Sequence, residues 1–132
     1  MVEINIGNEE WLSQVKEDII EPDIPIIDPH HHLWDDRGST YLLEDLQADT
    51  GSGHNVVKTV YMECGWAYKK DGPNHLRVVG ETEAVVDQAN KSKETGGAVI
   101  SAIVSRADLR LGDEVIEVLE AHEEASQGLL EG

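Results

Sequence analysis

Three consecutive histidines, His30, His31 and His32, are the residues of this sequence best suited to chemistry. They lie in IIDPHHHLWDD, residues 26–36, between an apolar run and two aspartates. Side chains alternate along a strand, so His30 and His32 are expected to share one face with Asp28, and His31 to lie on the other. Because imidazole nitrogens bind zinc at about 2.0–2.1 Å, the spacing indicates a divalent metal site formed by His30 and His32.

Two neighbouring residues suggest that this site lies where a strand ends. Pro29 has no N–H to donate to a sheet, so regular pairing is expected to stop near it. Asp28 would orient a metal ligand or help to position the end of the strand. The alternative is a polar strand end with solvated histidines, because a His-x-His pair supplies only two of the ligands that a zinc site needs.

The elements that position these residues can be read from the hydrophobic pattern. Apolar, β-branched runs predict three strands, and apolar residues at helical spacing predict four helices between and around them. The strands are expected within residues 24–34, 55–64 and 98–105, and the helices within residues 8–20, 41–53, 78–96 and 112–126. Nearly continuous apolar strands that alternate with amphipathic helices are typical of an α/β fold with a parallel sheet.

Right-handed crossovers would place the carboxyl ends of all three strands at one edge, where chemistry is found in open sheets and barrels. Glu63 ends the second strand there and would contact substrate or metal-bound water, or else be a solvated strand end. Trp34 and Trp66 lie in loops at that edge, where they would form an apolar wall for substrate or, more simply, anchor the loops. His75, in a later loop, would line a pocket.

Other polar residues are expected to have structural roles. His54 precedes the second strand and so falls at the opposite edge, and His122 lies on a helix, where it would pack or be solvated. Cys64 is expected to behave as a small buried hydrophobic residue. Glu81 and Glu83 lie in the first turn of a helix, where an interaction with the helix dipole is sufficient to explain them.

The composition limits the partners of the chain. Its 132 residues, 39% of them hydrophobic, are enough for a single modest domain. The 27 acidic and 10 basic residues give a net charge of −17, which argues against nucleic acid and anionic membranes as partners. A single cysteine, no visible secretory signal and no long apolar run favour a cytoplasmic protein.

IIDPHHHLWDD, together with YLLEDLQADTGSGHNVVKTVYMECGWAY and GPNHLRVVGETEAV, resembles the start of the amidohydrolase-related proteins of the metal-dependent hydrolase superfamily. The resemblance runs from about residue 24 to about residue 125. It implies a partial TIM-type (β/α) barrel, with residues 1–23 as an N-terminal helix and lead-in and residues 24–132 as the first three β/α units.

The resemblance also implies a function. The first strand of such barrels supplies two metal ligands, here His30 and His32 with His31 at the variable position between them, and the divalent metal that the resemblance favours is Zn²⁺. The parent reaction would be hydrolysis of a lactone, ester or amide carbonyl in a small molecule; a decarboxylase of the same superfamily is the alternative.

This chain departs from the family in length. Family members are usually more than twice as long, and their remaining ligands, commonly His on strands five and six and Asp on strand eight, have no counterpart here. A further alternative is therefore a non-catalytic fragment or pseudoenzyme that needs a partner chain, an oligomer or a missing C-terminal portion.

Overall fold

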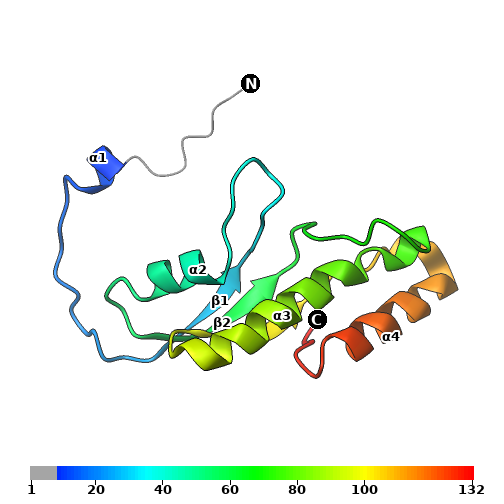
Figure 1. The fold of residues 1–132 in the computed structure, drawn as a ribbon. Coiled ribbons are helices and arrows are strands. Elements are labelled where there is room, and N and C mark those ends of the chain that lie inside the picture. The colour runs from blue at the N-terminus through cyan, green and yellow to red at the C-terminus, as the bar shows by residue number, and fades with distance from the viewer. Residues whose placement is uncertain (1–8) are drawn as a thin grey trace.

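The computed structural model describes residues 9–132, which form a parallel sheet with helices packed against it (Figure 1). Three strands lie in the order β1-β2-β3: β1 (Ile26–His31), β2 (Val56–Met62) and β3 (Val99–Val104). The helices are α1 (Glu9–Leu12), α2 (Leu43–Thr50), α3 (Val79–Thr95) and α4 (Val115–Ala125), with short 3-10 helices η1 (Asn74–Leu76) and η2 (Leu109–Glu114). The predicted α/β fold with a parallel sheet is confirmed.

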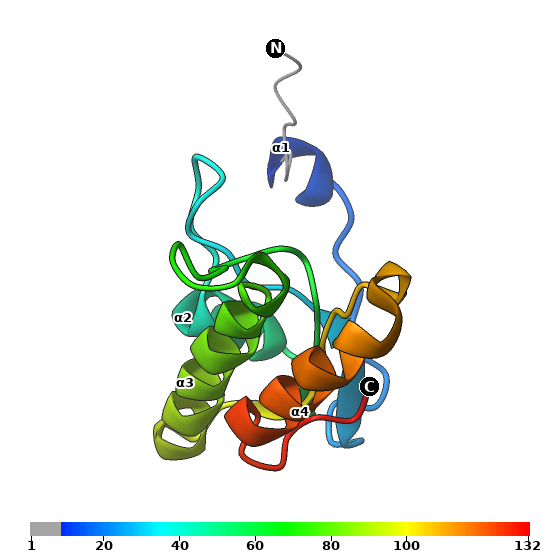
Figure 2. The ribbon, with the colours of Figure 1, turned by 90° about the vertical axis from the view of Figure 1, so that its right-hand side faces the viewer.

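Parallel pairing brings the carboxyl ends of the strands to one edge. His31 of β1 pairs with Tyr61 of β2, which in turn pairs with Ile103 of β3. The loops that follow the three strands therefore lie at a common edge, as the sequence pattern predicted. Helices α3 and α4 lie side by side, and the views agree in placing them on the same side of the sheet (Figure 2).

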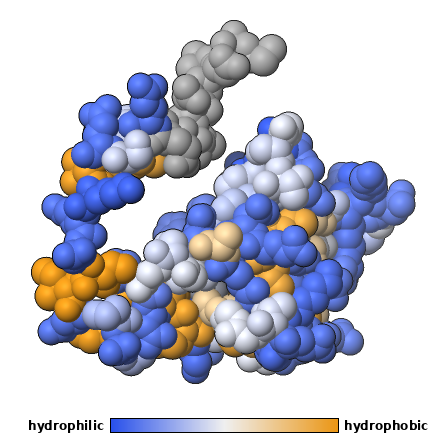
Figure 3. All heavy atoms as spheres, turned by 60° about the vertical axis from the view of Figure 1, so that its left-hand side comes forward, coloured by the Kyte–Doolittle hydropathy of each residue, from blue (hydrophilic) through white to orange (hydrophobic). Residues whose placement is uncertain are grey.

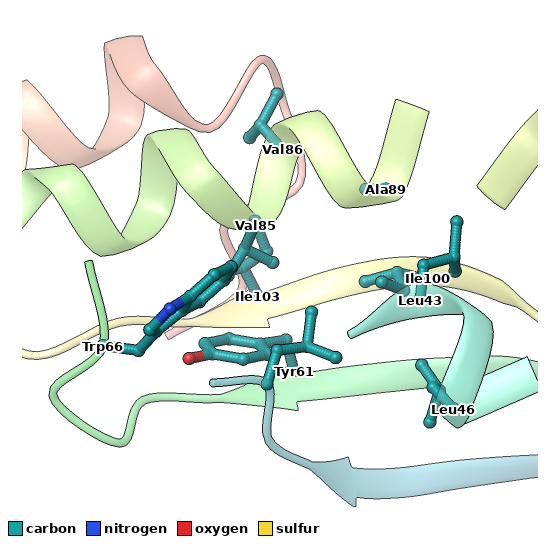
Figure 4. Close-up of a cluster of buried hydrophobic side chains, with 10 residues drawn as sticks. Leu43, Leu46, Tyr61, Trp66, Val85, Val86, Ala89, Ile100 and Ile103 are labelled. Atoms are coloured by element: carbon teal, nitrogen blue, oxygen red, sulfur yellow. The ribbon is translucent and has the colours of Figure 1, made fainter. Parts of the chain in front are cut away.

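The hydrophobic core lies between the sheet and α2 and α3 (Figure 4). Tyr61 of β2 and Ile100 of β3 are both 0% exposed and face the helices. The other buried members of this cluster are Leu33, Leu43, Leu46, Trp66, Val85, Val86, Ala89 and Ile103. The core is aliphatic apart from Tyr61 and Trp66, as expected for a chain without Phe.

Helix α3 forms because apolar residues recur on one of its faces and a glycine stops it. Val85, Val86 and Ala89 are at most 2% exposed and belong to the core cluster. Gly96 ends the helix with φ +76°, the left-handed conformation that glycine adopts without strain.

Gly80 in the first turn of α3 allows a close approach of the preceding loop. A Cβ at this position would lie 2.5 Å from the carbonyl oxygen of Ala67 and 2.8 Å from the backbone nitrogen of Lys69. Alanine normally stabilises a helix relative to glycine by about 1 kcal/mol. Here we expect Gly80→Ala to lower the free energy of unfolding by about 1–3 kcal/mol, because the loop backbone must move.

Urea denaturation of Gly80→Ala measures this effect, with Asp87→Ala on the exposed part of the same helix as the control. The control is expected to stay within about 0.5 kcal/mol of the wild type. A Gly80→Ala protein at least as stable as the wild type would show that the loop does not depend on this contact.

The residues after α4 lie beside β3. Ile103 donates its N–H to the carbonyl of Leu129 at 2.7 Å, and Glu131 donates to the carbonyl of Ile103 at 2.9 Å. Ser105 donates to the carbonyl of Gly132 at 2.7 Å, and Ile103 and Leu130 form a parallel bridge. Residues 129–132 thus run parallel to β3 along its outer edge and are joined to it by these hydrogen bonds and one isolated bridge.

The N-terminal helix is much shorter than the apolar pattern predicted. It was expected within residues 8–20, but α1 covers only Glu9–Leu12. Leu12 and Val15 are 52% and 69% exposed. Short helices are stable in water only when an apolar face packs against other residues. Leu12 and Val15 are largely exposed, so no such packing extends the helix beyond Leu12. Figure 3 shows α1 and the segment that leads from it toward β1 standing away from the body of the protein, with apolar side chains gathered near the base of this segment.

Within residues 9–132, no helix is both long and apolar enough to cross a membrane.

Candidate metal site at the carboxyl edge of the sheet

The rings of His30 and His32 converge at the carboxyl end of β1. Their Nε2 atoms lie 3.1 Å apart, and the rings meet edge to face at a centroid distance of 4.9 Å. His30 is exposed and His32 is half-buried. The two imidazoles that the spacing singled out are therefore brought together.

A backbone carbonyl orients the ring of His32. Its Nδ1 lies 2.8 Å from the carbonyl oxygen of Met62, the last residue of β2. A carbonyl oxygen can only accept, so Nδ1 carries the proton and Nε2 keeps its lone pair. This arrangement, in which one ring nitrogen donates to a carbonyl and the other is left as a ligand, is the usual one for a metal-binding histidine.

The distance between the two Nε2 atoms is compatible with a shared ion. Two nitrogens at about 2.0–2.1 Å from one zinc ion lie about 2.9 Å apart at an octahedral angle and about 3.3 Å apart at a tetrahedral angle. The observed 3.1 Å lies between these values. Among residues 9–132, however, no third His, Cys, Asp or Glu joins the pair in a metal-binding group.

Asp28 supports the strand rather than a ring. Its Oδ1 accepts the backbone N–H of His30 at 3.0 Å. The pairing of β1 with β2 is irregular between Asp28 and His31, around Pro29. Asp28 thus stabilises the strand end at the point where Pro29 interrupts the sheet.

His31 points to the opposite face and is 7% exposed. Its ring meets Tyr61 edge to face at a centroid distance of 5.6 Å. In the described part of the chain neither ring nitrogen has a hydrogen bond of good geometry, although the backbone of Val60 lies close enough to favour the charged ring. Burial lowers the pKa of His31 to about 4, although the charge of Asp28 partly opposes this.

The two tryptophans differ in their relation to the histidine pair. Trp34 borders the same cavity of about 420 Å³ as His30 and His32, and it stacks on Tyr41 at a centroid distance of 4.9 Å. Trp66 is 4% exposed and belongs to the core, with Nε1 donating to Asp35 at 2.8 Å. Trp34 can therefore form a wall of a site, whereas Trp66 anchors its loop.

Glu63 and His75 lie at the predicted edge, but His75 is separate from the pair. The N–H of Glu63 donates to Val104 at 3.0 Å, which continues the sheet by one residue. His75 borders a different cavity, of about 510 Å³, with Tyr68 and Arg106. Its Nε2 lies 2.8 Å from a carboxylate oxygen of Glu117. His75 therefore lines a different cavity from the one beside His30 and His32.

The remaining histidines lie away from the pair. His54 precedes β2 and borders a cavity at the opposite edge. His122 is 1% exposed, accepts from Thr82 at Nδ1 (2.8 Å) and donates from Nε2 to the carbonyl of Arg106 (3.0 Å). Burial lowers the pKa of His122. Of packing and solvation, the two alternatives expected for His122, the structure shows packing.

Glu81 was expected to need no explanation beyond the helix dipole, and this was wrong. The side chain is 3% exposed, and Oε1 accepts hydrogen bonds from the loop after β2. Its spacing of four from Val85 places it on the apolar face of α3, which is the sequence signal that indicates burial. Cys64 in that loop is half-buried and borders the core.

The chain is similar in sequence to part of a longer protein. An uncharacterized protein, y4mH of Sinorhizobium fredii (strain NBRC 101917 / NGR234), is 31% identical over 122 residues. The match covers 76% of this chain and 36% of the relative, so the chain spans about a third of that protein's length. No family model matches the chain. No solved structure matches it either.

Proposed function

We propose that this chain is the N-terminal part of a metal-dependent hydrolase of the amidohydrolase-related type, with His30 and His32 as ligands of a divalent ion such as Zn²⁺. The observation that carries the proposal is the convergence of the two Nε2 atoms, 3.1 Å apart, at the carboxyl edge of a parallel sheet. In the proposed fold, β1 to β3 are the first three strands of a (β/α) barrel, and residues 129–132 begin the fourth.

The residues of this chain would prepare such a site in three ways. Met62 holds the His32 ring with Nε2 available, and Asp28 keeps the end of β1 in place. Trp34 borders the cavity and would exclude water from one side of a small carbonyl substrate. A bound divalent ion polarises a carbonyl oxygen or lowers the pKa of water.

Zinc content tests the proposal. We expect wild-type protein that has been equilibrated with zinc and passed through a desalting column to retain it, and a His30→Ala/His32→Ala variant to bind at least about tenfold more weakly. Loss of a partner that merely orients a ligand already costs about 10–100-fold. Atomic absorption and zinc titration measure the two quantities.

His54→Ala is the matched control, since it removes an imidazole from the opposite edge of the sheet. It should leave zinc binding unchanged. Equal zinc content in the wild type and the double variant would reject the metal site.

A second candidate is favoured by the pairing of residues 129–132 with the outer edge of β3 and by the greater length of the relative. In this case the chain would be a non-catalytic fragment or pseudoenzyme that acts with a partner chain. The DNA downstream of this coding sequence distinguishes the two. Further strands with His and Asp residues, in frame or after a frameshift, favour the hydrolase, and unrelated sequence favours the partner-dependent fragment.

A further inference from the structure

We propose that Glu81 is a positioning residue, whose carboxylate holds the exit of β2 and thereby keeps the His32 ring aimed at His30. The importance of this aim for metal binding rests on the proposed function. The orientation of the His32 ring does not rest on the proposed function, because it is measured in protein without any metal.

The first observation is the set of hydrogen bonds on one carboxylate oxygen. Oε1 of Glu81 accepts the backbone N–H groups of Cys64, Gly65 and Trp66 at 2.8, 3.0 and 3.1 Å. It also accepts the hydroxyl of Tyr61 at 2.7 Å. Four donors from β2 and its following loop therefore meet on a single atom of α3.

The second observation is the shape of that loop. Gly65 has a positive φ angle of +81°, which helps to turn the N–H groups of Cys64, Gly65 and Trp66 toward a common point. Such a concave arrangement of N–H groups is an anion-binding nest. In this protein the anion is the protein's own carboxylate.

The other oxygen of Glu81 indicates that the carboxylate is kept in place by its bonds to the loop and not by contact with water. Oε2 is buried and has no hydrogen-bond partner in the described part of the chain. A buried acceptor without a partner is unfavourable. Glu81 thus occupies a position that leaves one oxygen unsatisfied, while the other satisfies three consecutive N–H groups.

The third observation connects the loop to the histidine pair. Met62, whose carbonyl accepts from His32, is two residues before Cys64. Trp66 donates from Nε1 to Asp35, and Arg37 donates to the carbonyl of Cys64, so the loop after β1 is tied to the same turn. His32 itself, through Met62, and the loop that follows it, through Asp35 and Arg37, are therefore bound to β2 and to the turn that Glu81 holds.

The test compares Glu81→Gln with Glu83→Gln in metal-free protein. Glutamine keeps the length of the side chain and one acceptor oxygen but removes the charge that strengthens hydrogen bonds to N–H groups. Glu83 lies two residues away on α3, and its carboxylate pairs with Lys69 at the surface, so it is a matched control.

The readout is the tautomer of His32, from long-range ¹H–¹⁵N spectra above neutral pH, with the signal assigned by its absence in His32→Gln. The wild type and Glu83→Gln should show the proton on Nδ1 alone, whereas Glu81→Gln should show both tautomers. A folded Glu81→Gln protein with the proton still on Nδ1 alone would overturn the proposal.

Zinc titration of the same proteins provides the second readout, with about 10–100-fold weaker binding expected for Glu81→Gln only. A wild type that binds no zinc contradicts the proposed function and leaves the tautomer result intact. If Glu81→Gln does not fold, Glu81→Ala in formate decides, because formate can occupy the nest. Recovery of the native His32 signal in formate but not in chloride supports the proposal, and no recovery overturns it.

Discussion

The folded state is expected to lose about 3 kcal/mol of stability as the pH falls from 6.5 to about 4, because the pKa of His31 is lowered over that interval. In the unfolded chain His31 takes up a proton near pH 6.5, but in the folded protein burial opposes protonation until about pH 4. The unfolded state thus binds more protons in this range. The stabilisation is fully present above pH 6.5 and is lost as the pH decreases.

Urea denaturation of metal-free protein at several pH values measures this loss, and His31→Leu is the comparison. Leucine fits the apolar surroundings and cannot be protonated, so the difference between the two stability curves should grow in favour of the variant below pH 6.5. His122, whose pKa burial also lowers, contributes in the same direction in both proteins. Parallel curves would contradict the assignment to His31.

Replacement of Ile100 by alanine is expected to lower the free energy of unfolding by about 2–5 kcal/mol. Ile100 is 0% exposed and packs in the core between β3 and the helices (Figure 4). Alanine removes three carbons from this core, and the sheet cannot collapse fully into the space because its strands are held by parallel pairing.

Ile116→Ala is the matched control for this substitution, since Ile116 on α4 is 55% exposed. The same change of side chain should alter its stability by no more than about 0.5 kcal/mol. Equal losses at the two positions, measured by thermal or urea unfolding, would show that the core is not located between β3 and α3.

The order of the elements could be predicted from local pattern. The apolar runs at β1, β2 and β3 and the helical spacing of α3 follow rules that act over a few residues, and the structure confirms them. The alternation of side chains along β1 likewise separates His31 from His30. The N-terminal helix was predicted too long, because periodicity shows an apolar face but not whether anything packs against it.

The amino-acid sequence by itself therefore determined the strand–helix order and the pairing of His30 with His32 on one face. Only the tertiary structure decided that Met62 orients His32, that His75 borders another cavity and that Glu81 is buried. The physical reason is range. Periods of 2 and 3.6 residues are local properties of the chain, whereas these contacts join atoms 15–42 residues apart and depend on how the loops turn at Gly65 and Ala67.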